Sequence, residues 1–243
     1  MDAGQEIIII RSHPRYAEAM QALSEAVYGY EASEENEIFT AAQYRHHIQI
    51  FPEGQFTALV GRQVIGLTVS MRIDFDPAHP FIESWWKTVN NGWLNHKPDG
   101  EWMYGVESVV HPNYQGRGIG GKLMEARYET ARRLNLRGMV AGSALVSYAK
   151  VAHLVSPEEY VRGVVEGRFF DNNLTKQLRK GFKVGALIPN YVDDKETLGW
   201  GAVIIWENPD YNPTAKVARR RIGARRYRMP LRPPYMAGSS PML

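Results

Sequence analysis

Hydrophobic positions in the first third of the chain follow first a strand pattern, then a helical pattern, then a strand pattern again. The aliphatic run from Ile7 to Ile10 is typical of a buried strand, whereas later apolar residues recur every three or four positions. Pro52 and Gly54 end the second helical stretch, and Gly61 lies between two strand-like runs, as in a hairpin. The pattern predicts a strand at 6–10, helices at 14–28 and 41–50, and strands at 56–60 and 64–73.

In the remainder of the chain, predicted helices and strands follow one another less regularly. Residues 76–100 are rich in Pro, Asn, Gly and Trp, with a short helix expected near 82–89. Ser156 followed by Pro157 resembles a helix start, and Gly181 a helix end. After residue 100 we expect strands at 102–110, 139–144, 182–187 and 202–206, and helices from the 116–121 region to about 134, within 147–172, and at 174–180.

Helices and strands are therefore mixed without strict alternation. This order favours an α+β fold with a mixed sheet over a doubly wound parallel sheet. We expect one domain over residues 1–210, with inserted segments near 76–100 and 147–172. Residues 211–243 form a basic C-terminal extension, with eight Lys or Arg residues and no acid.

Composition narrows the chemistry. The 243 residues carry a net charge of +3 and include no Cys, which excludes disulfides, thiolate metal sites and a thiol nucleophile. No apolar run is long enough to span a membrane, and no stretch resembles a secretion signal, so we expect a cytoplasmic protein without membrane contact. The seven His residues lack ligand spacing, so no metal is expected. Nucleic acid is not an expected partner, and a homodimer stays open.

The most informative segment runs from Val109 to Leu123, where a predicted strand leads through a glycine-rich loop into a long helix. Glycines let a ligand approach the main chain closely. The first turn of a helix presents unpaired N–H groups and a positive dipole end. Together these features predict an anion site suited to phosphate.

Two other phosphate-binding patterns compete for this segment, besides a plain glycine turn without ligand. A Walker A loop would need Ser or Thr where Leu123 stands. A dinucleotide fingerprint would need an acidic residue at the end of the next strand, and the predicted strand at 139–144 has none. Neither pattern is complete.

The run from Gln115 to Gly120, Gln-Gly-Arg-Gly-Ile-Gly, resembles the signature of the GCN5-related N-acetyltransferase (GNAT) superfamily. That signature is Gln/Arg-x-x-Gly-x-Gly/Ala, commonly preceded by an apolar strand, an x-Pro step and an aromatic residue. Here Val109 and Val110 are followed by His111-Pro112-Asn113-Tyr114. The resemblance implies a mostly antiparallel central sheet flanked by helices, and acetyl-CoA as co-substrate.

A narrower resemblance covers residues 51–207, which look like the acetyltransferase half of chains in which such a domain precedes a carbon–nitrogen hydrolase. It rests on runs such as Phe51-Pro52-Glu53-Gly54-Gln55 and Ser156-Pro157-Glu158-Glu159-Tyr160-Val161. No hydrolase is expected in the residues after 207. The resemblance implies transfer of an acetyl group to a small-molecule or peptide amine by direct attack.

The resemblance also implies the binding residues. Main-chain groups of Val109 and Val110 would hold the pantetheine arm and polarise the thioester carbonyl. The loop would hold the diphosphate, and its residues are Gln115, Gly116, Arg117, Gly118, Ile119, Gly120 and Gly121. Arg117 and Lys122 would either add positive charge there or belong to a solvated helix face.

Glu107 is the candidate general base, because relatives often carry a base on this strand. Alternation places its side chain on the same face of the sheet as that of Val109. Apolar neighbours would raise its pKa towards neutrality, which suits a base. The alternative is a structural carboxylate paired with Lys or Arg.

The general acid is missing from its usual place, since Gln177 stands where many relatives have Tyr. Tyr148, Tyr160 and Tyr191 are other candidates, or a water molecule. This departure leaves open a second interpretation, a non-catalytic acetyl-CoA-binding or protein-interaction module. Four Trp residues between 85 and 102 either line an acceptor pocket or fill the core.

Overall fold

The computed structural model describes residues 6–80, 83–215 and 227–230. The chain divides into two compact units. The first unit comprises Met1–Val69, Glu107–Arg127 and Arg221–Leu243, and the second comprises Ser70–Val106 and Tyr128–Arg220. Two strands and one long helix pass from one unit into the other, so each unit contains part of them.

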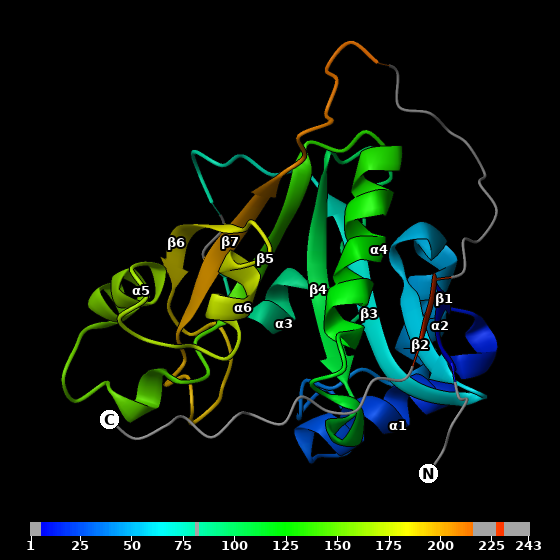
Figure 1. Ribbon diagram of the computed structural model, residues 1–243, viewed down its shortest axis with the longest axis horizontal. Coiled ribbons are helices and arrows are strands. Elements are labelled where there is room, and N and C mark those ends of the chain that lie inside the picture. Colours follow the sequence, from blue (N-terminus) through cyan, green and yellow to red (C-terminus); the bar gives the residue numbers. More distant parts are fainter. Residues whose placement is uncertain (1–5, 81–82, 216–226, 231–243) are drawn as a thin grey trace. The chain divides into compact units, whose positions relative to one another are not determined.

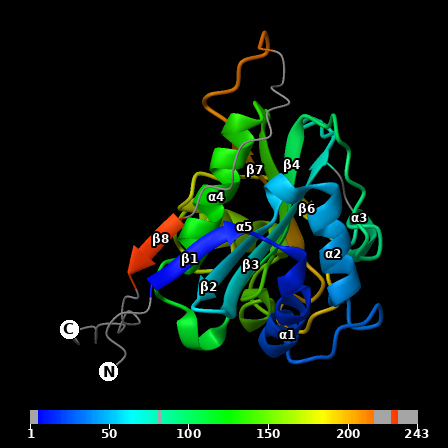
Figure 2. The ribbon, with the colours of Figure 1, turned by 90° about the vertical axis from the view of Figure 1, so that its right-hand side faces the viewer.

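The first unit contains three complete strands, two complete helices and parts of three further elements. Its strands follow the order β3-β2-β1-β8, and β1 pairs antiparallel with both β2 and β8 (Figure 2). Its elements are β1 (Glu6–Arg11), α1 (Ala17–Tyr28), α2 (Ala41–Ile50), β2 (Phe56–Val60), β8 (Tyr227–Pro230) and parts of β3 (Gln63–Ile73), β4 (Trp102–Val110) and α4 (Ile119–Arg133).

The two faces of this sheet are covered by different helices. Ile7 and Ile9 of β1 pack with Ile119 and Leu123 of α4 in a buried apolar cluster. Thr57, from the opposite face of β2, contacts Met20 of α1. The alternation predicted from sequence thus separates an α4 face from an α1 face.

Local signals set the ends of the two N-terminal helices. Helix α1 ends at Gly29, whose φ of 82° is left-handed and suits glycine. Helix α2 starts with a capping box between Thr40 and Gln43. The position of α1 and α2 beside the sheet brings their hydroxyl-bearing side chains towards the interior.

The second unit contains the remaining elements. Its strands follow the order β6-β7-β5-β4, antiparallel except for the parallel β4/β5 pair; β5, β6 and β7 lie side by side in Figure 1. The elements are α3 (Trp85–Thr88), β5 (Gly138–Ala144), α5 (Pro157–Val165), α6 (Leu174–Leu178), β6 (Lys183–Ile188) and β7 (Gly201–Glu207). Short 3₁₀ turns occur at Pro14–Tyr16, Pro52–Gly54, Pro112–Tyr114 and Tyr148–Lys150.

A buried carboxyl organises the 147–172 segment. Asp171 accepts hydrogen bonds from the Tyr160 hydroxyl (3.0 Å) and from the main-chain N–H groups of Ser147, Asn173 and Leu174. These bonds tie α5 to the start of α6. Residues that the sequence analysis treats as an insertion therefore have a structured, hydrogen-bonded interior.

The predicted fold class is confirmed: helices flank a mixed, mostly antiparallel sheet. The predicted ranges 41–50 and 102–110 coincide with α2 and β4. The domain boundary near residue 210 stays a prediction; within the proposed extension, Tyr227–Pro230 form β8. No helix in the described part of the chain is long and apolar enough to cross a bilayer.

Candidate active site

The glycine loop joins β4 to α4 within the first unit. Gly116 and Gly118 have φ values of 73° and 83°, a left-handed conformation that side chains disfavour. Helix α4 begins directly afterwards, at Ile119. Arg117, between these two glycines, is not left-handed, and such an alternation of conformations is typical of anion-binding nests.

The described hydrogen bonds include none donated by the main-chain N–H groups of Gly116, Arg117, Gly118, Ile119 or Gly121. A Cβ atom built on Gly121 would meet nothing within 4 Å, and one on Gly120 only a Val110 methyl at 4.0 Å. Packing therefore does not require glycine at 120 and 121. The open space and the donor groups fit a diphosphate that approaches the main chain.

Side chains of the loop hold its shape. The Gln115 amide donates to the Val110 carbonyl (3.1 Å), and Arg117 donates to the Asn113 carbonyl (3.1 Å) while it lies over the Tyr114 ring. Lys122 pairs with Glu125 on the surface of α4. The buried Ile119 side chain belongs to the core, so only its main chain faces the loop.

In β4, the main-chain N–H and C=O groups of Val109 and Val110 point to opposite sides of the strand. The His111 N–H reaches the Ile65 carbonyl on β3 at 2.9 Å, so His111 directs its main chain towards β3. Alternation gives Val109 the same direction, and its carbonyl lies close to Gly66 of β3. Val110 directs its main chain away from β3. Of the two predicted residues, Val110 is the one able to offer its N–H to a ligand.

Glu107 lies inside the first unit, with 6% of its surface exposed. Tyr44 of α2 donates a hydrogen bond to one carboxyl oxygen (2.8 Å), and Ser24 of α1 donates to the other (3.1 Å). Two hydroxyl groups, one from each helix, thus converge on one acid.

Burial raises the pKa of Glu107 from 4.5 to about 7. Hydrogen bonds from Tyr44 and Ser24 and the positive charge of Arg127 oppose this rise without cancelling it. The alternative was a structural carboxylate paired with Lys or Arg; the hydrogen bonds described for this carboxyl come from hydroxyl groups instead, and Arg127 bonds the Glu107 main-chain carbonyl. A carboxyl with a pKa near neutrality is able to take up and release protons at physiological pH.

Arg127 of α4 is a buried cation on the other side of β4. Its guanidinium donates to the main-chain carbonyls of Val69 on β3 and Glu107 on β4. It therefore joins the two strands at the position of the candidate base. Its side chain is 4% exposed, and a charge so deeply buried requires such partners.

Sequence reasoning found Glu107 but missed the residues around it. A signal in the sequence existed for one of them, Arg127. Arg127 occupies a position of the α4 pattern that apolar residues otherwise fill, and a charged residue at such a position indicates a buried charge. Tyr44 had no such signal, because its approach to Glu107 depends on how α2 packs.

The second unit contains the residues considered as general acids. Gln177 accepts a hydrogen bond from the buried Ser143 hydroxyl (2.5 Å) and carries no acidic proton. Tyr160 binds Asp171, and Tyr148 donates to the Val155 carbonyl. The Tyr191 ring packs against Gly142 and Gly201, where an added Cβ atom would clash with the ring. All three Tyr residues thus have structural partners.

The structure bears on the core-filling role of the Trp residues, while the acceptor-pocket role stays a prediction. Trp86 and Trp102 are buried, whereas Trp93 is 42% exposed. The half-buried Trp85 donates from its indole to the Val106 carbonyl of β4 at 3.0 Å. Core filling therefore applies to part of this set.

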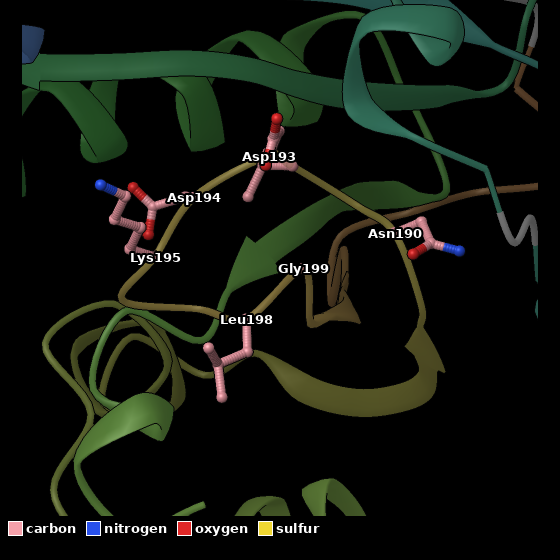
Figure 3. Close-up of a pocket in the computed structure, with 7 residues that line it drawn as sticks. Asn190, Asp193, Asp194, Lys195, Leu198 and Gly199 are labelled. Atoms are coloured by element: carbon pink, nitrogen blue, oxygen red, sulfur yellow. The ribbon is translucent and has the colours of Figure 1, made fainter.

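A separate hollow of about 450 Å³ occurs in the second unit (Figure 3). It contains none of the predicted site residues; its lining comprises Asn190, Val192, Asp193, Asp194, Lys195, Leu198 and Gly199. Asp194 accepts N–H groups of Glu196 and Thr197 and so stabilises its own turn. Among the described residues no group of three His, Asp or Glu side chains is placed to hold a metal.

A strand, a glycine loop and a helix thus follow one another at the mixed sheet, with a buried carboxyl on the same strand, which is the arrangement expected of the acetyltransferase (GNAT) family. A profile of the acetyltransferase (GNAT) family matches residues 20–148, more than half of the chain. The chain therefore belongs to the GNAT family, as its glycine signature predicted.

Two relatives from Bacillus subtilis (strain 168) support this assignment. "Uncharacterized N-acetyltransferase YkwB" is 35% identical over 72% of this chain and 77% of its own length. "Probable hydrolase YhcX" is 38% identical over 69% of this chain. The match covers 33% of YhcX, so the chain spans about a third of that relative. Similarity to a hydrolase-named protein agrees with the predicted resemblance to GNAT/hydrolase chains.

Solved structures agree on the fold. The GphF GNAT-like decarboxylase in complex with isobutyryl-CoA has a TM-score of 0.67 and 22% identity, and the match covers 82% of this chain and 98% of that one. The yncA structure from Salmonella typhimurium, with its cofactor acetyl-CoA, has a TM-score of 0.51 and 17% identity, covering 88% and 99%. The GNAT fold is thus established by sequence and structure together.

Proposed function

We propose that this chain transfers an acetyl group from acetyl-CoA to a small-molecule or peptide amine by direct attack. The observation that carries the proposal is the position of Glu107. It is a buried carboxyl with a pKa near 7, on the strand that leads directly into the glycine loop. Base and anion site therefore belong to one continuous segment of the first unit.

The glycine loop fits the co-substrate. The main-chain N–H groups of Gly116, Arg117, Gly118, Ile119 and Gly121 would hold the diphosphate, and the absence of side chains at 120 and 121 leaves room for it. Gln115 holds the loop against the end of β4. When bound, acetyl-CoA supplies an acyl group activated as a thioester. The Val110 N–H, directed away from β3, is suited to polarise the thioester carbonyl.

Glu107 serves as the general base. An amine that is protonated in water must lose a proton before its lone pair is able to attack. The carboxylate form of Glu107 accepts that proton, and the hydroxyl groups of Tyr44 and Ser24 orient it. The absence of Cys excludes an acyl-cysteine enzyme, which supports direct attack.

The departing thiolate needs no strong acid, because thiolates are good leaving groups. Gln177 is able to offer an amide N–H but no acidic proton. Its bond to Ser143 also favours the second candidate function, a module that binds acetyl-CoA without transferring the acetyl group.

One assay separates these functions. The purified chain is incubated with acetyl-CoA and a panel of primary amines, and free CoA is measured with a thiol reagent. Because the chain contains no Cys, it contributes no background. We expect wild-type turnover, and at least a ~100-fold lower rate for Glu107→Gln, a typical value for loss of a general base.

Glu101→Gln is the matched control, since Glu101 is exposed and pairs with Arg137 on the surface. It should keep the wild-type rate. Binding of acetyl-CoA in a calorimeter, without CoA release with any amine, would support the binding module instead. Equal rates for Glu107→Gln and wild type would remove Glu107 from the mechanism.

A further inference from the structure

Strand β8 covers one edge of the sheet in the first unit. In the order β3-β2-β1-β8 it is the outermost strand, and Figure 2 shows it beside β1. The two strands come from distant parts of the sequence, yet they pair antiparallel, with Ile7 opposite Met229 and Ile9 opposite Tyr227. Without β8, the main chain of β1 would lie open on that side.

The main-chain directions in β1 show which of its residues face β8. The Ser12 N–H reaches the carbonyl of Gln55, the residue before β2, at 2.9 Å, so Ser12 directs its main chain towards β2. Because this direction alternates along a strand, Ile7 and Ile9 direct their N–H and C=O groups the other way, towards β8. The same two residues bury their side chains in the cluster with α4, which holds β1 in place independently of β8.

An open β1 edge would be prone to pair with other chains. Four consecutive isoleucines, from Ile7 to Ile10, make up most of the strand. Isoleucine favours extended main chain, and an uncovered apolar edge strand is a template for edge-to-edge association. Two copies of β1 are able to pair symmetrically about Ile8, with Ile7 of one copy opposite Ile9 of the other, because both residues direct their main chains outward.

Strand β8 itself offers little to a further strand. It ends at Pro230, which has no main-chain N–H. Pro230 lies opposite Glu6, whose main chain does not face β8, so the missing N–H breaks no bond of the pair. Tyr227 and Met229 direct their main chains towards β1, which leaves Arg228 as the residue of β8 with an outward N–H. A short strand with proline on its outer side ends a sheet without recruiting another chain.

We propose that β1 is a docking edge for extended main chain, that Tyr227–Pro230 of the same chain occupies this edge, and that β1 of a second copy binds there when β8 is displaced. The segment thus covers a surface through which the chain would otherwise associate with itself. The inference concerns the first unit alone and does not depend on acetyl transfer.

The test uses two full-length proline variants. Met229→Pro removes an N–H that faces β1, whereas Arg228→Pro removes one that faces outward and is the matched control. Molecular mass is measured by light scattering over a series of protein concentrations. Amide hydrogen exchange, followed by NMR, reports on β1 independently: the Ile7 and Ile9 amides face β8, and the Ile8 amide, which faces β2, is the internal reference.

We expect the mass of Met229→Pro to approach ~2-fold that of wild type as the concentration rises, because two equivalent edges that pair symmetrically form a closed dimer. At low concentration its Ile7 and Ile9 amides should exchange at least ~10-fold faster than in wild type, and they should regain protection as the mass rises. The Ile8 amide should stay protected throughout. Arg228→Pro should match wild type in mass and in exchange.

Each contrary result overturns the proposal at a different step. Wild-type mass and wild-type exchange in Met229→Pro would show that β8 does not cover the edge. Fast exchange of Ile7 and Ile9 at every concentration, without a change in mass, would remove the second copy as occupant. Association of both proline variants would show a general effect of proline, and loss of Ile8 protection in Met229→Pro would show that β1 does not persist as a docking edge.

Discussion

The hydroxyl of Tyr44 donates a 2.8 Å hydrogen bond to the carboxyl of Glu107, across 63 positions of sequence. Tyr44 comes from α2 and Glu107 from β4, and both side chains are buried. A donor at this place stabilises the carboxylate, while burial destabilises it. The pKa near 7 is the result of this opposition, and it governs how the protein should respond to pH.

The rate of acetyl transfer should rise with pH through about 7. Glu107 accepts a proton only as a carboxylate, and burial raises its pKa from 4.5 to about 7. A plot of kcat against pH should therefore show an inflection near 7. The inflection should disappear in Glu107→Gln, and a wild-type inflection near 4.5 would show that the carboxyl is solvated.

The stability of the fold should change in the opposite direction. Because the folded pKa of Glu107 lies above that of a free carboxyl, the folded chain binds this proton more tightly than the unfolded chain. The contribution is complete below pH 4.5 and is lost as pH rises through about 7. Relative to Glu107→Gln, wild type should lose on the order of 3 kcal/mol of unfolding free energy, since one pKa unit corresponds to ~1.4 kcal/mol.

Urea unfolding of both proteins at pH 4.5 and pH 8 measures this difference. The comparison between the two proteins removes contributions from the other titratable groups, which they share. Parallel pH dependences for wild type and Glu107→Gln would contradict the prediction.

Gly121→Asp should weaken co-substrate binding while the fold remains intact. A side chain at 121 meets no atom of the protein within 4 Å, so the change is tolerated in the free protein. It places a negative charge where the diphosphate is expected. The Kd for acetyl-CoA should rise at least ~10-fold, a cost of ~1.4 kcal/mol, with the melting temperature nearly unchanged.

Asn113→Asp is the control for this change, because it adds the same charge at an exposed position of the same loop. It should bind acetyl-CoA almost as well as wild type in isothermal titration calorimetry. If both variants bind equally well, the diphosphate lies elsewhere.

Arg127→Met should weaken both the fold and the base. The Arg127 guanidinium bonds the carbonyls of Val69 and Glu107, which would lose these partners inside the protein. We expect a loss of about 3 kcal/mol of unfolding free energy, as for other buried charged groups that are removed. The Arg127 charge also lowers the pKa of Glu107, so the inflection in kcat should move to higher pH.

Arg133→Met makes the same replacement near the end of the same helix, at a half-buried position. It should leave the inflection in place and destabilise the protein less, as measured by urea unfolding and pH–rate profiles. An unchanged inflection in Arg127→Met would show that its charge does not act on Glu107.

Much of the fold could be predicted because the relevant signals are local. The helix over 41–50 is defined by the Thr40 and Gln43 capping box and by Pro52, and the strand over 102–110 by its apolar run. The family could be predicted for the same reason. Its diphosphate loop lies in consecutive residues, and glycines at 116 and 118 adopt the left-handed conformation that their spacing implied.

The surroundings of Glu107 depended on packing instead. Sequence showed an acid inside an apolar strand, but not that Ser24 and Tyr44 would meet it. Those residues lie more than sixty positions away, on helices whose rotation about the sheet is set by many apolar contacts together. The main-chain direction that favours Val110 over Val109 likewise follows from a hydrogen bond to Ile65, on another strand.

The sequence by itself thus determined the order of helices and strands, the family and the location of the glycine loop, because each follows from neighbouring residues. Only the tertiary structure decided which groups enclose the acid and that its pKa lies near neutrality. Burial and desolvation are properties of the assembled interior, and no local stretch of chain contains them.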